Sequence, residues 1–205
     1  LGSSSVESVV ETAVSAVKAC IKKTGYLYAD THSTQPVKLD AYNGKKAEFI
    51  ISGDKLFVKS FDDSNDTFSL FRHTVTNGVV SAAEMLDTSI KACNIIGADV
   101  WYRRSVTGSS LCDLYKYSTE KEKIDGDVAS FAGLSDGSVL IVKNFVSSSD
   151  GEIADLYLYD GKKTSLVAEK AELKNMKYSD KGISFIRSGG DLCIYSKNKL
   201  AIIDG

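Results

Sequence analysis

The sequence predicts an all-β protein in which a short antiparallel meander is repeated about five times. Apolar and polar residues alternate through most of the chain after residue 24, as they do in strands with one buried face. A segment that ends in an aromatic ring or a histidine also recurs, at residues 37–42, 68–73, 113–117, 155–159 and 191–195. The closing rings are 31, 44, 42 and 36 residues apart. A period near 40 residues with three or four strands in each unit is typical of β-propeller arrays.

An amphipathic helix is predicted over residues 5–23, before the strands. Its apolar residues follow the spacing of one helical face: Val6, Val9, Val10, Ala13, Val14, Val17, Cys20 and Ile21. Ser4 or Ser5 is suited to cap its start, and Gly25 to end it. Valine is a mediocre helix former, so packing on the β domain, or on a partner, has to stabilise this helix. The predicted domains are the helix at residues 1–24 and a β-repeat domain at residues 25–205.

Each repeat unit is predicted to start with a strand, and these first strands are residues 25–30, 55–61, 99–104, 138–142 and 182–187. Polar turns join the second and third strands of a unit, and Asn77-Gly78 and Asp160-Gly161 supply the positive φ angles of tight hairpins. An inner strand fits between later units, at residues 89–96, 128–134 and 173–178. The 47–54 connection is too short for one, so unit one lacks its inner strand.

Three arrangements of the units stay open. They are an irregular five-unit ring, an open fan that the helix covers, and a fragment that a longer chain or another copy completes. A sandwich of two meandering sheets is the alternative architecture, because short strands at regular spacing also permit it.

Composition argues against two classes of partner. The 205 residues carry a net charge of -2, so no basic field favours nucleic acid, for which clustered lysine and arginine are expected. The longest apolar runs, such as residues 139–142, are far shorter than the roughly 20 residues that cross a bilayer. The chain begins with Leu1 rather than methionine, so we expect that an upstream segment has been processed or trimmed.

The sequence carries no motif for catalysis, metal binding or a cofactor. Cys20, Cys93, Cys112 and Cys193 are widely separated without a Cys-x-x-Cys pair, which argues against a zinc or thioredoxin-type site. We interpret them as buried thiols, with two disulfides in an oxidising compartment as the alternative. No Gly-x-Ser-x-Gly segment follows a strand. We therefore expect no catalytic residue, no metal and no cofactor.

The histidines and the repeated aspartates have structural interpretations. His73 stands where the other four units have tyrosine, so a packed or hydrogen-bonded histidine is expected there. Aspartate recurs near strand starts at positions 99, 113, 155 and 191. Two such carboxylates could serve a glycosidase. An aspartate repeated at one place in every unit more often caps a turn, because catalysis needs two carboxylates in different environments.

Two groups of residues are the candidate binding residues. Trp101, Tyr102, Arg103 and Arg104 follow one another on a strand, and tryptophan, tyrosine and arginine are enriched at binding hot spots. A core tryptophan with arginines at the strand end is the interpretation that we favour for this strand. Asp62, Asp63 and Asp66 lie in a loop that offers the oxygen ligands calcium prefers, but the loop lacks EF-hand spacing and is also interpreted as a solvated turn.

The loops between first and second strands are predicted as the contact surface, because they differ in length and charge while the strands stay alike. These loops are residues 31–35, 62–66, 107–110, 147–152 and 188–190.

The segment Asp-Leu-Tyr-Leu-Tyr-Asp-Gly-Lys-Lys at residues 155–163 resembles TolB-like propeller repeats, as do its counterparts at 113–117 and 191–195 and the strand at 138–142. The resemblance covers about residues 25–205 as a pattern, is specific in the last three units and is poorest in unit one. Such repeats occur in bacterial surface and periplasmic proteins that mostly act as protein-binding or scaffold modules, whereas a minority carry enzymes.

The resemblance therefore implies a non-catalytic binding or scaffold module of a bacterial envelope or extracellular protein. It would engage a protein partner or another copy of itself, and the resemblance supplies no catalytic residue. A carbohydrate-binding or carbohydrate-active protein, with a cleft at one end of the β array, is the alternative function.

Overall fold

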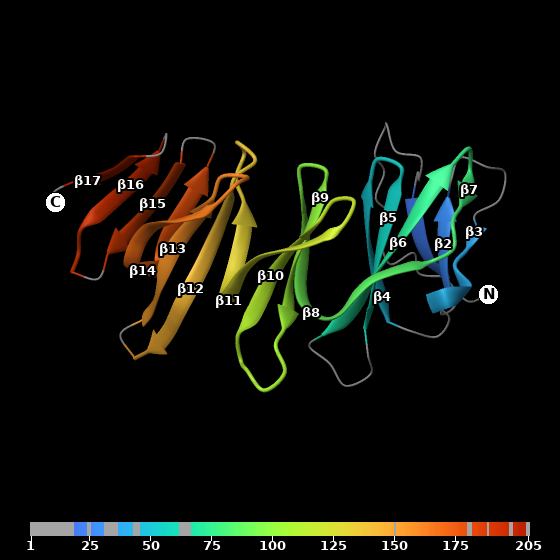
Figure 1. Ribbon diagram of the computed structural model, residues 1–205, viewed down its shortest axis with the longest axis horizontal. Coiled ribbons are helices and arrows are strands. Elements are labelled where there is room, and N and C mark those ends of the chain that lie inside the picture. Colours follow the sequence, from blue (N-terminus) through green and yellow to red (C-terminus); the bar gives the residue numbers. More distant parts are fainter. Residues whose placement is uncertain are drawn as a thin grey trace, which may run out of the picture. The chain divides into compact units, whose positions relative to one another are not determined.

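The computed structural model describes residues 19–23, 26–30, 37–42, 46–61, 67–149, 151–179, 182–187, 189–196 and 199–203 (Figure 1). These residues form antiparallel strands that follow one another in chain order, which confirms the predicted all-β meander. The chain divides into two compact units, Leu1–Ala92 and Cys93–Gly205. Each unit is described by itself.

The first unit contains two small sheets. One consists of β1 (Ala19–Lys23), β2 (Tyr26–Asp30) and β3 (Val37–Lys38), and the 3-10 turn η1 (Asp40–Tyr42) follows it. The other consists of β4 (Ala47–Ser52), β5 (Lys55–Phe61), β6 (Phe68–Thr76) and β8 (Glu84–Ile96), with the short β7 (Val79–Val80) paired to β6. Ala29, Leu39 and Tyr42 pack against Leu56, Val58 and Val75, so the two sheets share a core.

In the second unit every strand pairs with the next one along the chain. The strands are β9 (Asp99–Ser105), β10 (Cys112–Tyr117), β11 (Lys121–Gly133), β12 (Val139–Ser148), β13 (Gly151–Tyr159), β14 (Thr164–Ser179), β15 (Gly182–Arg187), β16 (Leu192–Ser196) and β17 (Lys199–Ile203). This is one continuous meander in the described part of the unit, and not the two-sheet sandwich that was the alternative.

The long strands β11 and β14 belong to two meanders each. The first part of β11 pairs with β10 and its second part with β12. In the same way β14 pairs first with β13 and then with β15. The predicted third strand of one unit and the predicted inner strand of the next are therefore halves of a single strand.

A bulge marks the point where each long strand changes partners. Ser89 in β8, Asp127 in β11 and Lys170 in β14 have φ angles of 57°, 58° and 52°. Each lies at or next to a shift in pairing register and is followed by a fully buried residue. A bulge bends a strand and increases its twist. The bulges therefore let each long strand pair with one meander in its first part and with the next meander in its second part.

The last four meanders share one register, which confirms the predicted repeat at the level of single residue pairs. The leucine of each second strand lies opposite the same position of the first strand, in the pairs Lys59–Leu70, Arg103–Leu114, Val142–Leu156 and Ile186–Leu192. The closing ring also keeps its partner, in the pairs Leu56–His73, Val100–Tyr117, Val139–Tyr159 and Ile183–Tyr195. The repeat therefore places equivalent side chains on equivalent faces.

The first of the five repeat units predicted from the sequence departs from the repeat, as its poor match to the pattern indicated. Its predicted second strand, residues 37–42, is only the two-residue β3 followed by η1, because the chain turns inward and buries Tyr42 beside His73. The strand that was expected after residues 43–46, as the third strand of this repeat unit, is β4. It pairs with β5 of the next meander instead of with β3. The prediction that the 47–54 connection is too short for an inner strand is therefore wrong, because Ala47–Ser52 form β4 and pair with β5 along its length.

The predicted helix is wrong for its last five residues. Ala19–Lys23 form β1, paired with β2 from Ala19↔Asp30 to Lys23↔Tyr26. Only two residues separate β1 from β2. The backbone hydrogen bonds between the two strands outweigh a weak local preference for helix. Residues 5–18 of the predicted helix lie outside the described residues, and the boundary between a helical segment at 1–24 and a β domain at 25–205 stays a prediction. In the described residues no helix is long and apolar enough to cross a membrane.

In the second unit, both faces of the meander formed by β11, β12, β13 and the first part of β14 are buried, and strand β12 shows how. Val139 and Ile141 point into a cluster with Trp101, Leu114, Val128 and Tyr159. Leu140 and Val142, which alternate with them, point into a cluster with Leu156, Ile183, Phe185 and Cys193. Successive side chains of a strand point to opposite faces. The meanders of this unit are thus stacked face to face, as propeller blades are, whereas ring closure stays a prediction.

Candidate functional site

Trp101 and Tyr102, predicted as binding residues, are buried. Trp101 is 3% exposed and meets Tyr159 edge to face with ring centroids 5.5 Å apart. Tyr102 is fully buried and stacks on Tyr115 at 5.6 Å. Arg103 is half-buried and donates from Nη1 to the carbonyl oxygen of Ala129. A binding role for this strand would therefore rest on Arg103 and Arg104, which are both partly accessible.

The other predicted contact residues remain predictions. Asp62, Asp63 and Asp66 lie outside the described residues, as does the loop at 31–35. Residues 107–110 are exposed, as the loop prediction requires, but nothing in their surroundings favours a ligand. In the described part of the chain no three histidine, cysteine, aspartate or glutamate side chains gather where they could hold a metal ion. Cys112 and Cys193 are buried free thiols, and burial raises the pKa of Cys193.

Two of the repeated aspartates, Asp99 and Asp113, form ion pairs with lysines. Asp99 pairs with Lys116 at 3.1 Å, and this hydrogen-bonded contact raises the pKa of Lys116. Asp113 pairs with Lys123 at 2.8 Å and raises its pKa in the same way. Each carboxylate is therefore paired with a lysine of the adjacent strand.

Asp155, the first residue of the predicted second strand at 155–159, lies within β13 and caps a bulge in the next strand. Its Oδ1 accepts a hydrogen bond of 2.9 Å from the backbone nitrogen of Lys170, the bulge residue of β14. Its Oδ2 accepts a second bond of 2.7 Å from Asn144. The carboxylate thus satisfies a backbone donor that the bulge removes from the ladder. Asp155 therefore acts as the predicted cap, whereas Asp99 and Asp113 form ion pairs with lysines.

His73 is a hydrogen-bonded core histidine, as predicted. It is 3% exposed, its Nδ1 lies 2.8 Å from the carbonyl oxygen of Ser81, and its Nε2 lies 2.8 Å from the hydroxyl of Tyr42. A carbonyl oxygen only accepts, so Nδ1 carries the proton and Nε2 accepts from Tyr42. Both ring nitrogens are therefore occupied, although His73 also lines a small pocket of about 190 Å³.

Replacing Tyr42 with phenylalanine is expected to lower the free energy of unfolding by about 1–3 kcal/mol, because Nε2 of His73 is left buried without a donor. Urea denaturation measures the change. Tyr115→Phe is the matched control, since the Tyr115 hydroxyl makes only a 3.4 Å contact with Asp113 and its side chain is half-buried. Equal losses in the two variants would contradict the assigned hydrogen bond.

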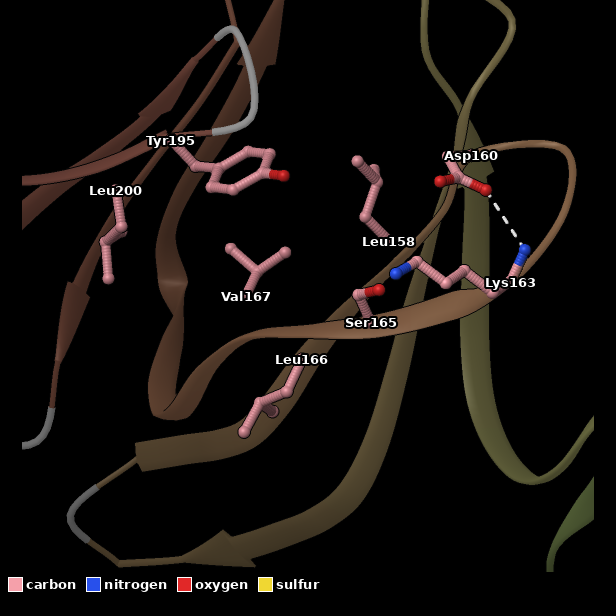
Figure 2. A pocket seen from close by; sticks show the side chains of 8 residues that line it. All are labelled: Leu158, Asp160, Lys163, Ser165, Leu166, Val167, Tyr195 and Leu200. Atoms are coloured by element: carbon pink, nitrogen blue, oxygen red, sulfur yellow. Dashed lines mark hydrogen bonds between the residues drawn. The ribbon is translucent and has the colours of Figure 1, made fainter.

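A pocket lies between two meanders of the second unit, and Figure 2 shows it. Its volume is about 480 Å³. The lining residues come from β13, the following turn, β14, β16 and β17: Leu158, Asp160, Lys163, Ser165, Leu166, Val167, Tyr195 and Leu200. Pockets of this size are typical of ligand sites.

The pocket has an apolar floor and a polar rim. Leu158 and Val167 are nearly buried, whereas Leu166 and Leu200 are 49% and 39% exposed. Lys163 and Tyr195 approach from opposite sides, and in Figure 2 their polar ends point into the space beside Leu158. Such a lining suits an aliphatic group that lies next to an anion.

The charges of the pocket are assigned by its hydrogen bonds. The Asp160 carboxylate accepts from the backbone nitrogens of Lys163 at 3.0 Å and Lys162 at 2.9 Å, and these bonds hold the pKa of Asp160 below its ordinary value. Burial, followed by the charges of Asp136 and Asp160, raises the pKa of Tyr195, so its hydroxyl stays protonated at neutral pH. Within the described residues no ion pair occupies the Lys163 ammonium, although its charge is close enough to Asp160 to contribute to the lowered pKa of that carboxyl. Lys163 is therefore the cation open to a ligand.

No known protein family and no curated protein matches the sequence. Solved structures do resemble it. One comes from a study of two prolyl endopeptidases and their inter-domain dynamics. The alignment covers 93% of this chain and 35% of the chain in that structure, at 12% sequence identity and a TM-score of 0.53.

The β-propeller domain of the Trilobed protease from Pyrococcus furiosus, of open velcro topology, covers 91% of this chain and 66% of its own at 16% identity and a TM-score of 0.47. TolB from Acinetobacter baumannii covers 95% and 51% at 13% identity and a TM-score of 0.42. At 12% identity, the likeness to the first structure shows a similar fold and nothing about function. This chain spans about a third of the length of that first structure.

Proposed function

We propose that this protein is a non-catalytic binding module whose pocket between β13–β14 and β16–β17 takes a segment of a protein partner. The observation that carries the proposal is the open Lys163 ammonium above an apolar floor, flanked by the exposed side chains of Leu166 and Leu200. The segment that fits is one in which an aliphatic side chain stands next to a carboxylate.

The chemistry of the pocket supports binding rather than a reaction. Asp160 is the carboxylate of the rim, and its Oδ1 is held by two backbone amides. Acid–base catalysis needs a group whose pKa lies near the working pH. The low pKa of Asp160 and the raised pKa of Tyr195 both move away from that range. A rigid meander frame with a fixed cation is suited to recognition.

The compartment and the further contacts of the module belong to the same proposal. The resemblance of residues 113–117, 155–163 and 191–195 to TolB-like repeats supports a location in a bacterial envelope or outside the cell. Arg103, Arg104 and the loop with Asp62, Asp63 and Asp66 are proposed as additional contacts. No observation favours the carbohydrate alternative, because Trp101, the residue best suited to stack on a sugar, is buried.

A displayed peptide library selected against the immobilised protein tests the pocket. We expect enriched peptides to carry aspartate or glutamate beside leucine, isoleucine or valine. Lys163→Glu should weaken their binding at least tenfold, about 1.4 kcal/mol, because attraction becomes repulsion. A Leu166→Asp/Leu200→Asp variant should have the same effect by removing the apolar walls.

Val79→Asp is the matched control, because Val79 is a 69% exposed aliphatic residue in the first unit, far from the pocket in the chain. Its binding should equal that of the unmodified protein. If no peptides are enriched, or if the pocket variants bind as well as Val79→Asp, the proposed function is wrong.

A further inference from the structure

The last meander, formed by the end of β14 with β15, β16 and β17, has an open apolar face. Its aliphatic residues are Ile186, Leu192, Ile194, Ala201 and Ile203. Leu192, Ile194 and Ile203 are 40%, 36% and 43% exposed. The alternate residues Ile183, Phe185 and Cys193 point to the opposite face, where they are fully buried against the preceding meander. The face defined by these five residues is called the outer face below.

The equivalent positions are buried in the two preceding meanders. Leu114, Leu156 and Leu192 occupy the same register position in successive second strands. Leu114 packs with residues of β12 and Leu156 packs with residues of β15, and both are 0% exposed. Only Leu192 meets no following sheet among the described residues. The outer face therefore has the composition of an interface between meanders, yet Leu192, Ile194 and Ile203 are exposed.

We propose that the outer face binds the same face of a second copy of this chain. Aliphatic residues fill the centre of the face, so its partner has to be an equally apolar sheet surface. Each copy offers that surface, and a two-fold axis makes the contact self-complementary. Meander-on-meander stacking is also how this chain already buries the equivalent leucines.

Charges at the edge of the outer face fit a two-fold arrangement. In β14, Glu172 lies opposite Ile186 and Lys177 lies opposite Ser184, and directly opposed residues point to the same face. A two-fold axis that runs across the strands reverses the strand direction of the second copy. Lys177 of one copy then faces Glu172 of the other, twice in the dimer. The same operation places Leu192 over Ile194.

The association is expected to be reversible and weak. Four strands about 4.8 Å apart and five residues long cover a patch of roughly 15 Å by 17 Å. This is well below the area of about 800 Å² per partner that standard stable complexes bury. We therefore expect a dissociation constant between about 10 and 500 µM, with monomers prevailing in dilute solution.

Sedimentation velocity over a concentration series up to about 500 µM tests the proposal through the two charges. The unmodified chain should shift from monomer toward dimer. Glu172→Lys and Lys177→Glu should each weaken dimerisation at least tenfold, because each creates two like-charged pairs across the axis. The double variant Glu172→Lys/Lys177→Glu should restore it. Restoration distinguishes paired charges from a loss of folding.

A second variant tests the apolar centre. Leu192→Ser/Ile194→Ser should abolish dimerisation while the thermal transition remains cooperative, and Leu166→Ser/Leu200→Ser, at the pocket, should leave dimerisation unchanged. A chain that stays monomeric up to about 500 µM would overturn the proposal. Dimerisation that survives the Leu192 and Ile194 changes, or double charge reversal without restoration, would overturn it equally. None of these outcomes bears on peptide binding in the pocket.

Discussion

Replacing Gly182 with alanine is expected to lower the free energy of unfolding by about 3–5 kcal/mol, a loss found only where a specific structural conflict arises. Gly182 begins β15 with a φ of +134°, a conformation that residues with a side chain rarely adopt. A Cβ atom at this position would lie 2.2 Å from the carbonyl oxygen of Tyr195. That oxygen belongs to the backbone of the neighbouring strand, so β15 and β16 would have to separate where they pair.

Gly189→Ala is the matched control for this substitution. Gly189 has a similar φ of +123°, but nothing lies within 4 Å of the position that a Cβ atom would take. This variant should lose only the backbone strain, about 1–3 kcal/mol. Urea denaturation of both variants measures the difference. A loss in Gly182→Ala no greater than in Gly189→Ala would show that Tyr195 moves away without cost.

The strands and their register could be predicted from the sequence because both are local properties. The predicted first strands at residues 55–61 and 182–187 have the observed bounds of β5 and β15. Alternation together with the recurring Asp-Leu-Tyr pattern determines which residues face inward, since a shift by one residue would expose the whole apolar set. Leu114 and Leu156 are buried for this reason.

The bulges escaped prediction because their signal is conformational. Asp127 and Lys170 adopt positive φ angles, yet neither is glycine and neither interrupts a run of strand-forming residues in a recognisable way. The alternation only changes phase there, which looks like the end of one strand and the start of another. The Asp155 carboxylate that holds Lys170 was recognisable as a cap, but the backbone nitrogen that it caps was not.

The pocket escaped prediction because it joins residues distant in the sequence. Leu158, Lys163 and Leu166 precede Tyr195 and Leu200 by about thirty residues or more, and no pattern states that the two groups meet. One signal was available: Leu166 and Leu200 are large aliphatic residues next to the turns at Lys163 and Lys199, where exposed apolar residues are unusual. The five predicted loops, by contrast, were chosen for variability, which exposed segments without a ligand also show.

Trp101 could be interpreted from the sequence as a core tryptophan or as a binding residue, and its place in the repeat indicates the core. It lies opposite Lys116 in β10, as Leu140 lies opposite Leu158 in β13, and both leucines are nearly buried. Comparing equivalent positions of the repeat would therefore have assigned Trp101 to the interior before the structure was known. Residue type alone does not distinguish a hot spot from a core aromatic.

Trp101→Ala is accordingly expected to destabilise the fold by about 3–5 kcal/mol, because the removed side chain leaves a cavity among Leu114, Val128 and Tyr159. For a chain of this size, 1 kcal/mol shifts the melting temperature by about 2–4 °C, so the transition should fall by roughly 10 °C. Trp101→Phe keeps an aromatic ring beside Tyr159 and should lose clearly less. If Trp101→Ala instead melts like the unmodified chain and loses only partner binding, Trp101 is a contact residue and its assignment to the core is wrong.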